Sequence, residues 1–196
     1  MHTIVGITGG IGSGKSTAAA LLERRGFRRL DSDALVRQQV LTSAPVVAAL
    51  RERFGEDVVN SDSVVNRTQL AARVFAVESE LRWLEELTHP KVFELWRAAF
   101  RASPDVDWVV EVPLLFEKCL EIWFDFTVCV ASAPAQQLAR LEQRGLSRAL
   151  AEQRISKQLP LAQKIERADF VLWNDGSPEF LLEQVSRLNV SLQAIR

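Results

Sequence analysis

The chain has 196 residues, of which 47% are hydrophobic and 25% charged, as in an ordinary soluble globular protein. Its formal net charge of -1 lacks the strong basic excess of a general nucleic-acid binder, so we expect no nucleic-acid partner. No apolar run approaches the roughly 20 residues of a membrane helix, and no signal-peptide pattern opens the chain. The two cysteines, Cys119 and Cys129, have neither metal-site nor redox-pair spacing. These features predict a cytoplasmic protein that does not contact a membrane.

Five short apolar runs are predicted to be the strands of a buried sheet. They span residues 3–8, 27–31, 108–112, 126–131 and 170–173. Several are continuous rather than alternating, which is typical of parallel strands covered on both faces. Helical patterns separate them, so the sequence predicts an α/β fold with a doubly wound, five-stranded parallel sheet.

The first and last helices have clear end signals. The first is predicted to begin near Lys15 and to end before Gly26, which suits the position after a helix. The last is predicted to begin with Ser177 as its cap and Pro178 at its first position, followed by an apolar stripe that packs on the sheet.

Two helical excursions interrupt the predicted core. In the first, residues 34–105, helices are expected before Pro45 and over 46–54, 68–75, 78–88 and 91–102. It is too long for a simple crossover, so we interpret it as a helical substrate-binding insertion. The second, residues 134–167, is interpreted as a lid with flanking helices. We therefore predict a single domain over 1–196, with core segments 1–33, 106–133 and 168–196.

A phosphate-binding loop follows the first strand. The segment Gly9-Gly10-Ile11-Gly12-Ser13-Gly14-Lys15-Ser16 matches the pattern G-x-x-x-x-G-K-[ST] between a strand and a helix. Glycines let backbone N–H groups approach an anion, which the helix N-terminus also attracts. We expect Lys15 to reach the β- and γ-phosphates of ATP, Ser16 to bind Mg²⁺, and Thr17 to contact the α-phosphate. No N-K-x-D tetrapeptide is present, which disfavours a GTPase.

Acidic residues follow two of the predicted strands. The second strand ends at Asp31-Ser32-Asp33, where Asp33 can accept a hydrogen bond and a proton from an attacking hydroxyl. The alternative is that one of these aspartates caps a helix. Glu111 ends the third strand, where a Walker-B carboxylate would meet the hydration shell of Mg²⁺. The alternative is a simple acidic residue at a strand end.

Basic residues gather in the predicted lid. Residues 140–167 contain seven Arg or Lys against three Glu. Helical spacing places Arg140 and Arg144 on one face, from which they could stabilise charge on a transferred phosphoryl group. A solvated basic face is the alternative for any single arginine.

In combination, the motifs resemble those of the dephospho-CoA kinases over nearly the whole chain. They are the phosphate loop, Asp31-Ser32-Asp33 with Arg37, His89-Pro90, the segment 112–117, Arg140-Leu141 with Arg144, residues 154–158, and Ala168-Asp169-Phe170 with Asn174-Asp175-Gly176. The resemblance implies a P-loop kinase fold and ATP-dependent phosphorylation of the ribose 3′-hydroxyl of 3′-dephospho-CoA, the last step of coenzyme A synthesis.

The resemblance also assigns residues to roles. It places Asp33 at the 3′-hydroxyl, Arg140 near the ATP phosphates and Asn174 near the adenine. Thr8, Asp33, Arg37 and His89 are assigned to the substrate side. A histidine before proline is, on its own, more typical of a helix end than of a catalyst.

The sequence departs from the family pattern at two positions. Ser32 replaces the usual alanine, which we expect to be harmless, and Glu111 stands where aspartate is frequent, which leaves open whether it meets Mg²⁺ directly or through water.

Two alternatives remain: another P-loop kinase acting on a nucleoside monophosphate or hydroxyl metabolite, and a nucleotide-binding module without catalysis. Asp33 with Arg140 and Arg144 favours an enzyme, because nucleotide binding alone requires none of them. The sequence predicts no particular oligomeric state.

Overall fold

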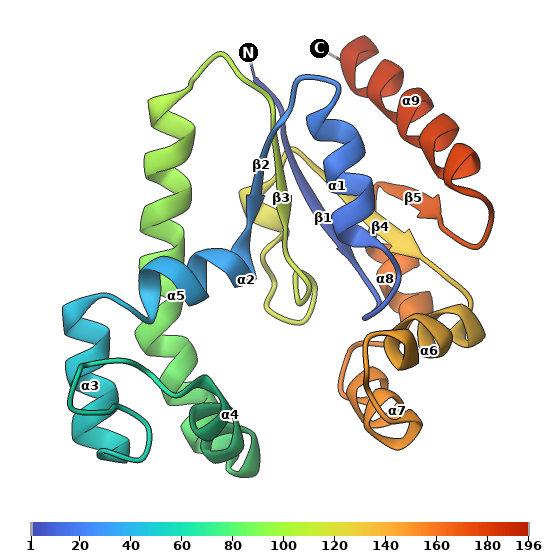
Figure 1. Ribbon diagram of the computed structural model, residues 1–196. Helices are drawn as coiled ribbons and strands as arrows, with labels where there is room; N and C mark the ends of the chain where they lie inside the picture. Colours follow the sequence, from blue (N-terminus) through green and yellow to red (C-terminus); the bar gives the residue numbers. More distant parts are fainter. Residues whose placement is uncertain (1, 196) are drawn as a thin grey trace. The chain divides into compact units, whose positions relative to one another are not determined.

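The computed structural model describes residues 2–195, which include a five-stranded parallel sheet (Figure 1). The strands are β1 (Ile4–Gly9), β2 (Arg28–Asp31), β3 (Trp108–Glu111), β4 (Phe126–Ala131) and β5 (Phe170–Trp173). Their order is β2-β3-β1-β4-β5, and every neighbouring pair is parallel. All five predicted strands are confirmed, with bounds that differ by one residue at β1, β2 and β3.

The chain divides into two compact units, Met1–Asp31 with Pro104–Arg196, and Ser32–Ser103. The first unit contains the sheet and the helices α1 (Lys15–Glu23), α6 (Pro134–Gln143), α7 (Arg148–Ser156), α8 (Leu161–Arg167) and α9 (Pro178–Ala194), with a 3₁₀ turn at Glu121–Trp123. The second unit contains α2 (Ser32–Leu35), a π-helical turn over Val36–Val40, α3 (Ala44–Phe54), α4 (Arg67–Ala76) and α5 (Glu78–Ala102).

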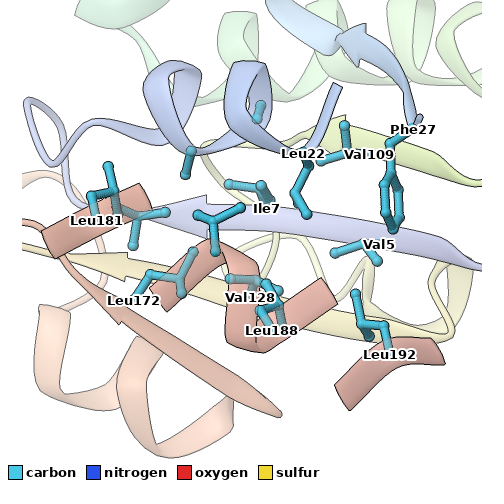
Figure 2. Packing of buried hydrophobic residues seen from close by; sticks show 14 residues of the cluster. Val5, Ile7, Leu22, Phe27, Val109, Val128, Leu172, Leu181, Leu188 and Leu192 are labelled. Atoms are coloured by element: carbon cyan, nitrogen blue, oxygen red, sulfur yellow. The ribbon is translucent and has the colours of Figure 1, made fainter. Parts of the chain in front are cut away.

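The main core lies between the sheet and helices α1 and α9 (Figure 2). Val5 and Ile7 of β1 point to the same face because side chains alternate along a strand, and both are fully buried. Leu22 of α1 and Leu181 and Leu188 of α9 belong to the same buried cluster. This packing fixes the direction in which β1 delivers the chain to the loop at its carboxyl end.

The predicted ends of the first and last helices are confirmed. Gly26 follows α1 with a φ of 99°, a left-handed conformation that glycine adopts without strain. Ser177 caps α9, where its hydroxyl accepts a hydrogen bond from the N–H of Phe180. Among residues 2–195, no helix has both the length and the apolar composition for a membrane span.

The prediction of two helices separated at His89-Pro90 is wrong, because α5 runs without interruption from Glu78 to Ala102. Proline removes one N–H from the helical ladder. However, Thr88, Val92 and Trp96 are all buried and lie at spacings of four on both sides of Pro90. Burial of this continuous stripe outweighs the loss of one backbone hydrogen bond.

Candidate functional site

The glycine-rich loop leads from β1 directly into α1. Gly14 is the residue before α1 and has a φ of 98°. A Cβ atom at this position would also lie 2.1 Å from Nδ2 of Asn174, so any other residue would strain the backbone and require the Asn174 side chain to move. The first turn of α1 carries no acidic side chain, so its positive end is available to an anion.

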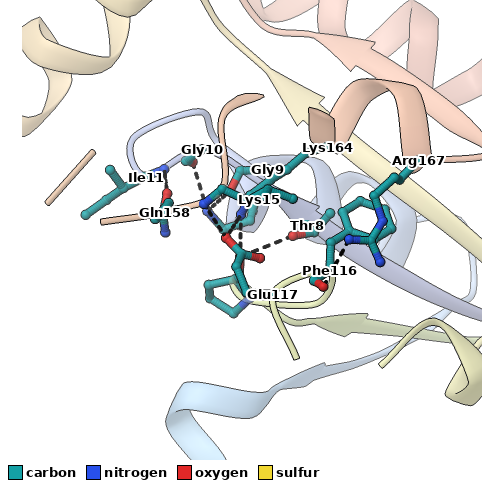
Figure 3. A network of polar contacts seen from close by, with 12 residues as sticks. Thr8, Gly9, Gly10, Ile11, Lys15, Phe116, Glu117, Gln158, Lys164 and Arg167 are labelled. Atoms are coloured by element: carbon teal, nitrogen blue, oxygen red, sulfur yellow. Dashed lines mark hydrogen bonds and ion pairs between the residues drawn. The ribbon is translucent and has the colours of Figure 1, made fainter. Parts of the chain in front are cut away.

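Lys15 folds back over the loop that precedes it. Its Nζ donates to the carbonyl oxygens of Gly9, at 3.3 Å, and Gly10, at 3.0 Å (Figure 3). These carbonyls hold the ammonium group at the loop. A phosphate group would offer stronger, charge-assisted hydrogen bonds to the same ammonium.

A polar chain joins Ser16 in the first turn of α1, Glu111 at the end of β3 and Arg29 within β2. The hydroxyl of Ser16 donates to Oε2 of Glu111 at 2.8 Å, and Arg29 forms an ion pair with Oε1 of Glu111 at 2.6 Å. The Glu111 side chain is only 5% exposed, so both of its oxygens are held in a mostly buried setting. The parallel register pairs Asp31 of β2 with Glu111 of β3, and pairs Arg29, two residues earlier, with Val109. Arg29 therefore lies on the strand next to Glu111.

Arg140 of α6 joins the phosphate loop to the end of β5. Its guanidinium group donates to the carbonyl oxygens of Gly12 at 3.3 Å and Asn174 at 2.7 Å, and to the hydroxyl of Ser132 at 3.0 Å. The side chain of Asn174 donates in turn to the carbonyl oxygen of Ser13 at 2.8 Å. Arg140 and Asn174 therefore hold the phosphate loop through hydrogen bonds to its carbonyl oxygens.

The other candidate residues of the first unit lie in different environments. Thr8 is fully buried, and its hydroxyl donates to the carbonyl oxygen of Pro113 at 3.2 Å. Thr17 is exposed in the first turn of α1, and Arg144 is exposed immediately after α6, one turn beyond Arg140. The structure thus brings Arg140 onto the loop, whereas Arg144 faces solvent.

Three candidate residues belong to the second unit. Asp33 and Arg37 are exposed, four residues apart on the continuous helical segment formed by α2 and the π-helical turn. His89 lies within α5 and is half-buried, with its ring 5.9 Å from that of Phe93. Asp33 follows the last residue of β2 by two positions.

Cys129 lies on β4, paired in register with Thr8. It is fully buried, and burial raises the pKa of its thiol from the ordinary 9.0 to about 11, although the positive charges of Lys164 and Lys15 act in the opposite direction. The thiol is therefore protonated at neutral pH, which makes it a poor nucleophile.

Sequence reasoning missed the roles of Arg29 and Lys164. Lys164 of α8 is fully buried and forms an ion pair with Glu117 at 2.7 Å. The burial of Lys164 could not be predicted from a local sequence pattern, because its acidic partner Glu117 lies on a loop that is distant in the sequence. Arg29 also had no local signal, because its partner Glu111 lies on the neighbouring strand β3.

Comparison with known proteins agrees with this geometry. The sequence model of the family described as dephospho-CoA kinase matches residues 3–179. The dephospho-CoA kinase of Thermosynechococcus vestitus is 43% identical over 93% of this chain and 91% of its own. That of Anaeromyxobacter dehalogenans is 41% identical over 98% of this chain and 93% of its own.

Solved structures give the same fold. The crystal structure of TT1252 from Thermus thermophilus is 36% identical, has a TM-score of 0.87 and covers 97% of both chains. Dephospho-CoA kinase from Campylobacter jejuni, at 22% identity and a TM-score of 0.72 over 98% of both chains, shares the fold. This chain belongs to the dephospho-CoA kinase family.

Proposed function

We propose that this protein transfers the γ-phosphoryl group of ATP to the ribose 3′-hydroxyl of 3′-dephospho-CoA, giving coenzyme A and ADP in the last step of coenzyme A synthesis. The observation that carries the proposal is the hydrogen bond from Ser16 to Glu111 beside Lys15, in a chain of the dephospho-CoA kinase family. A hydroxyl, a carboxylate and an ammonium group at a helix N-terminus are the parts that P-loop phosphotransferases use on ATP.

The loop residues are assigned to ATP. Backbone N–H groups of Gly10, Gly12, Gly14, Lys15 and Ser16 would surround the phosphates. Ile11, Ser13 and Thr17 are assigned to the same nucleotide loop, although their N–H groups already donate to Gln158, Gly10 and Gly14. Lys15 would exchange the carbonyls of Gly9 and Gly10 for phosphate oxygens. Asn174, which touches the loop at Ser13, is assigned to the adenine side, and Arg144 to the nucleotide from its exposed position after α6.

The oxygen groups of this site fit Mg²⁺. Within residues 2–195 no cluster of three or more His, Cys, Asp or Glu side chains could hold a metal ion. A site that offers Ser16 as a ligand suits Mg²⁺, which keeps several waters and binds substrate phosphates. Bound Mg²⁺ would neutralise charge on the β- and γ-phosphates. Because both oxygens of Glu111 are engaged, we assign it to orienting Ser16 and a metal-bound water rather than to direct ligation.

Proton transfer is assigned to Asp33. Its carboxylate is exposed and therefore able to meet a substrate hydroxyl. As the acceptor oxygen forms its bond to phosphorus and the bond to the β-phosphate oxygen breaks, the hydroxyl proton passes to Asp33. Arg37 and His89 are assigned to binding dephospho-CoA within the helical insertion 34–105.

Arg140 is assigned to charge stabilisation at the loop. Its guanidinium group contacts the carbonyl oxygen of Gly12 and the hydroxyl of Ser132. It therefore acts on the phosphates through the loop that binds them, in addition to its own positive charge. Residues 134–167 would exclude water from the transferred group as a lid, which suppresses hydrolysis of ATP. The reaction is assigned to the cytoplasm.

An acceptor panel tests the proposed function. The protein is incubated with ATP, Mg²⁺ and either 3′-dephospho-CoA, a nucleoside monophosphate or shikimate, and ADP release is followed. Release that requires 3′-dephospho-CoA supports the proposal. Release with another acceptor and none with 3′-dephospho-CoA would assign the chain to a different phosphotransferase reaction.

A further inference from the structure

The peptide group between Gly10 and Ile11 is held at both ends. The carbonyl oxygen of Gly10 accepts from Nζ of Lys15 at 3.0 Å and from the N–H of Ser13 at 3.1 Å. The N–H of Ile11 donates to Oε1 of Gln158 at 2.9 Å (Figure 3). Gln158 is thus the side chain that fixes the N–H end of a peptide whose carbonyl end holds the catalytic lysine.

Gln158 approaches the loop from a distant segment that is itself anchored. It lies just after α7, and the next residue, Leu159, donates its N–H to Oε1 of Glu117 at 2.9 Å. Glu117 forms an ion pair at 2.7 Å with Lys164, which is fully buried and also donates to the carbonyl oxygen of Pro113 at 3.0 Å. Burial and multiple partners fix Lys164, and through Glu117 they fix the backbone that carries Gln158.

Gly10 packs closely against a side chain of α6. A Cβ atom on Gly10 would lie 2.3 Å from Nε2 of Gln137, a buried residue of α6. The glycine permits this close approach, but it also gives the backbone more conformational freedom than any other residue would. An acceptor for the N–H of Ile11 restricts that freedom, because rotation of the peptide would break its bonds to Gln158, Lys15 and Ser13 together.

From these contacts we infer that Gln158 is a positioning residue of the phosphate loop, which sets the Gly10–Ile11 peptide, and with it Lys15, for ATP. The inference rests on the proposed function in that ATP is the ligand of this loop. It links nucleotide affinity to the segment after α7, which the motif pattern of the loop does not include. Without Gln158 the loop would sample further conformations, and ATP binding would have to select one of them.

The test compares Gln158→Ala and Gln158→Met with the wild type. Methionine has a similar length but lacks the amide oxygen, so it separates the hydrogen bond from simple packing. Gln193→Ala is the matched control, because Gln193 is an exposed glutamine of α9 and lies outside the proposed lid. Gln158 is half-buried and lies outside the apolar core, so each variant is expected to fold.

Binding of a non-hydrolysable ATP analogue with Mg²⁺ is measured by calorimetry, without acceptor. Both Gln158 variants are expected to bind about fivefold more weakly, the loss that corresponds to one hydrogen bond, and Gln193→Ala is expected to bind as the wild type does. In turnover, KM for ATP should rise in the same proportion, while KM for dephospho-CoA stays constant.

Two results would overturn the inference: wild-type affinity in Gln158→Ala, or wild-type affinity in Gln158→Met. Because binding is measured without acceptor, the inference and the proposed function fail separately. A wild type that binds the analogue and leaves dephospho-CoA unmodified contradicts only the proposed function.

Discussion

The hydroxyl oxygen of Ser16 lies 2.8 Å from Oε2 of Glu111, and the hydroxyl donates a hydrogen bond to that carboxylate. This donation orients the lone pairs of the serine oxygen away from Glu111, which is the geometry a metal ligand requires. The same carboxylate holds Arg29 through its other oxygen, so a single side chain connects α1, β2 and β3 at the carboxyl edge of the sheet.

Replacing Glu111 by glutamine tests its indirect role at the metal. Glu111→Gln keeps the shape but loses the charge that orders Ser16 and Arg29. Turnover is expected to fall by about 10- to 100-fold, as is typical when the partner of a metal ligand is changed, with a higher Mg²⁺ concentration needed for half-maximal rate. Glu183→Gln, on the exposed side of α9, is the control. An unchanged Mg²⁺ requirement would remove Glu111 from the metal site.

Lys15→Ala should impair phosphoryl transfer broadly, because it removes the charge at the β- and γ-phosphates. We expect a fall in turnover of about 10² to 10³-fold, the range for loss of one donor to a developing charge. Lys15→Arg keeps the charge with a different shape and is expected to recover little. A wild-type rate in Lys15→Ala, measured by ADP release, would contradict the assignment of the phosphate loop.

Asp33→Asn should separate catalysis from nucleotide binding. Asparagine cannot take the proton of the acceptor hydroxyl, so turnover is expected to fall by ~10²-fold or more, with ATP affinity nearly unchanged. Asp62→Asn, an exposed change in the same unit, is the control. Near-normal turnover in Asp33→Asn would take this carboxylate out of the chemistry.

The buried ion pair of Lys164 and Glu117 should behave as a unit in urea unfolding. Lys164→Met leaves the Glu117 carboxylate without its buried partner and is expected to lower the free energy of unfolding by about 3–5 kcal/mol. Glu117→Gln added to Lys164→Met should then cost less than Glu117→Gln alone. Additive losses in this double-mutant cycle would mean that the two side chains contribute independently.

The thiol of Cys129 makes stability depend on pH above neutrality. Because burial raises its pKa to about 11 in the folded protein from 9.0, its contribution is complete below pH 9 and is lost as the pH rises toward 11. Relative to Cys129→Ala, the wild type should therefore lose about 2 kcal/mol of unfolding free energy between pH 8 and pH 10.5. A constant difference between the two proteins would show that the thiol pKa is not raised.

Features of the fold that depend on neighbouring residues could be predicted from the sequence, whereas features that depend on contacts between distant segments could not. The strands and the loop from Gly9 to Ser16 carry local signals, namely continuous apolar runs and glycine spacing, and the structure confirms both elements. The single helix α5 was not predicted, because the buried stripe that overrides Pro90 depends on packing between helices.

The polar partners of the site depend on contacts between distant segments. Arg29 meets Glu111 only because β2 and β3 are neighbours in the sheet, and Gln158 meets Ile11 across 147 residues of sequence. No local pattern encodes such pairs. The roles of Thr8, Arg144 and His89 remain predictions to be tested by substitution.

Identifying the product formed from ATP and 3′-dephospho-CoA is the decisive test of the proposed reaction. Mass spectrometry and co-chromatography with authentic coenzyme A would follow the reaction of the wild type beside Lys15→Ala. We expect a product that is heavier by one phosphoryl group and identical to coenzyme A, formed by the wild type and nearly absent with the variant. Unmodified 3′-dephospho-CoA after incubation with active, ATP-binding wild type would contradict it.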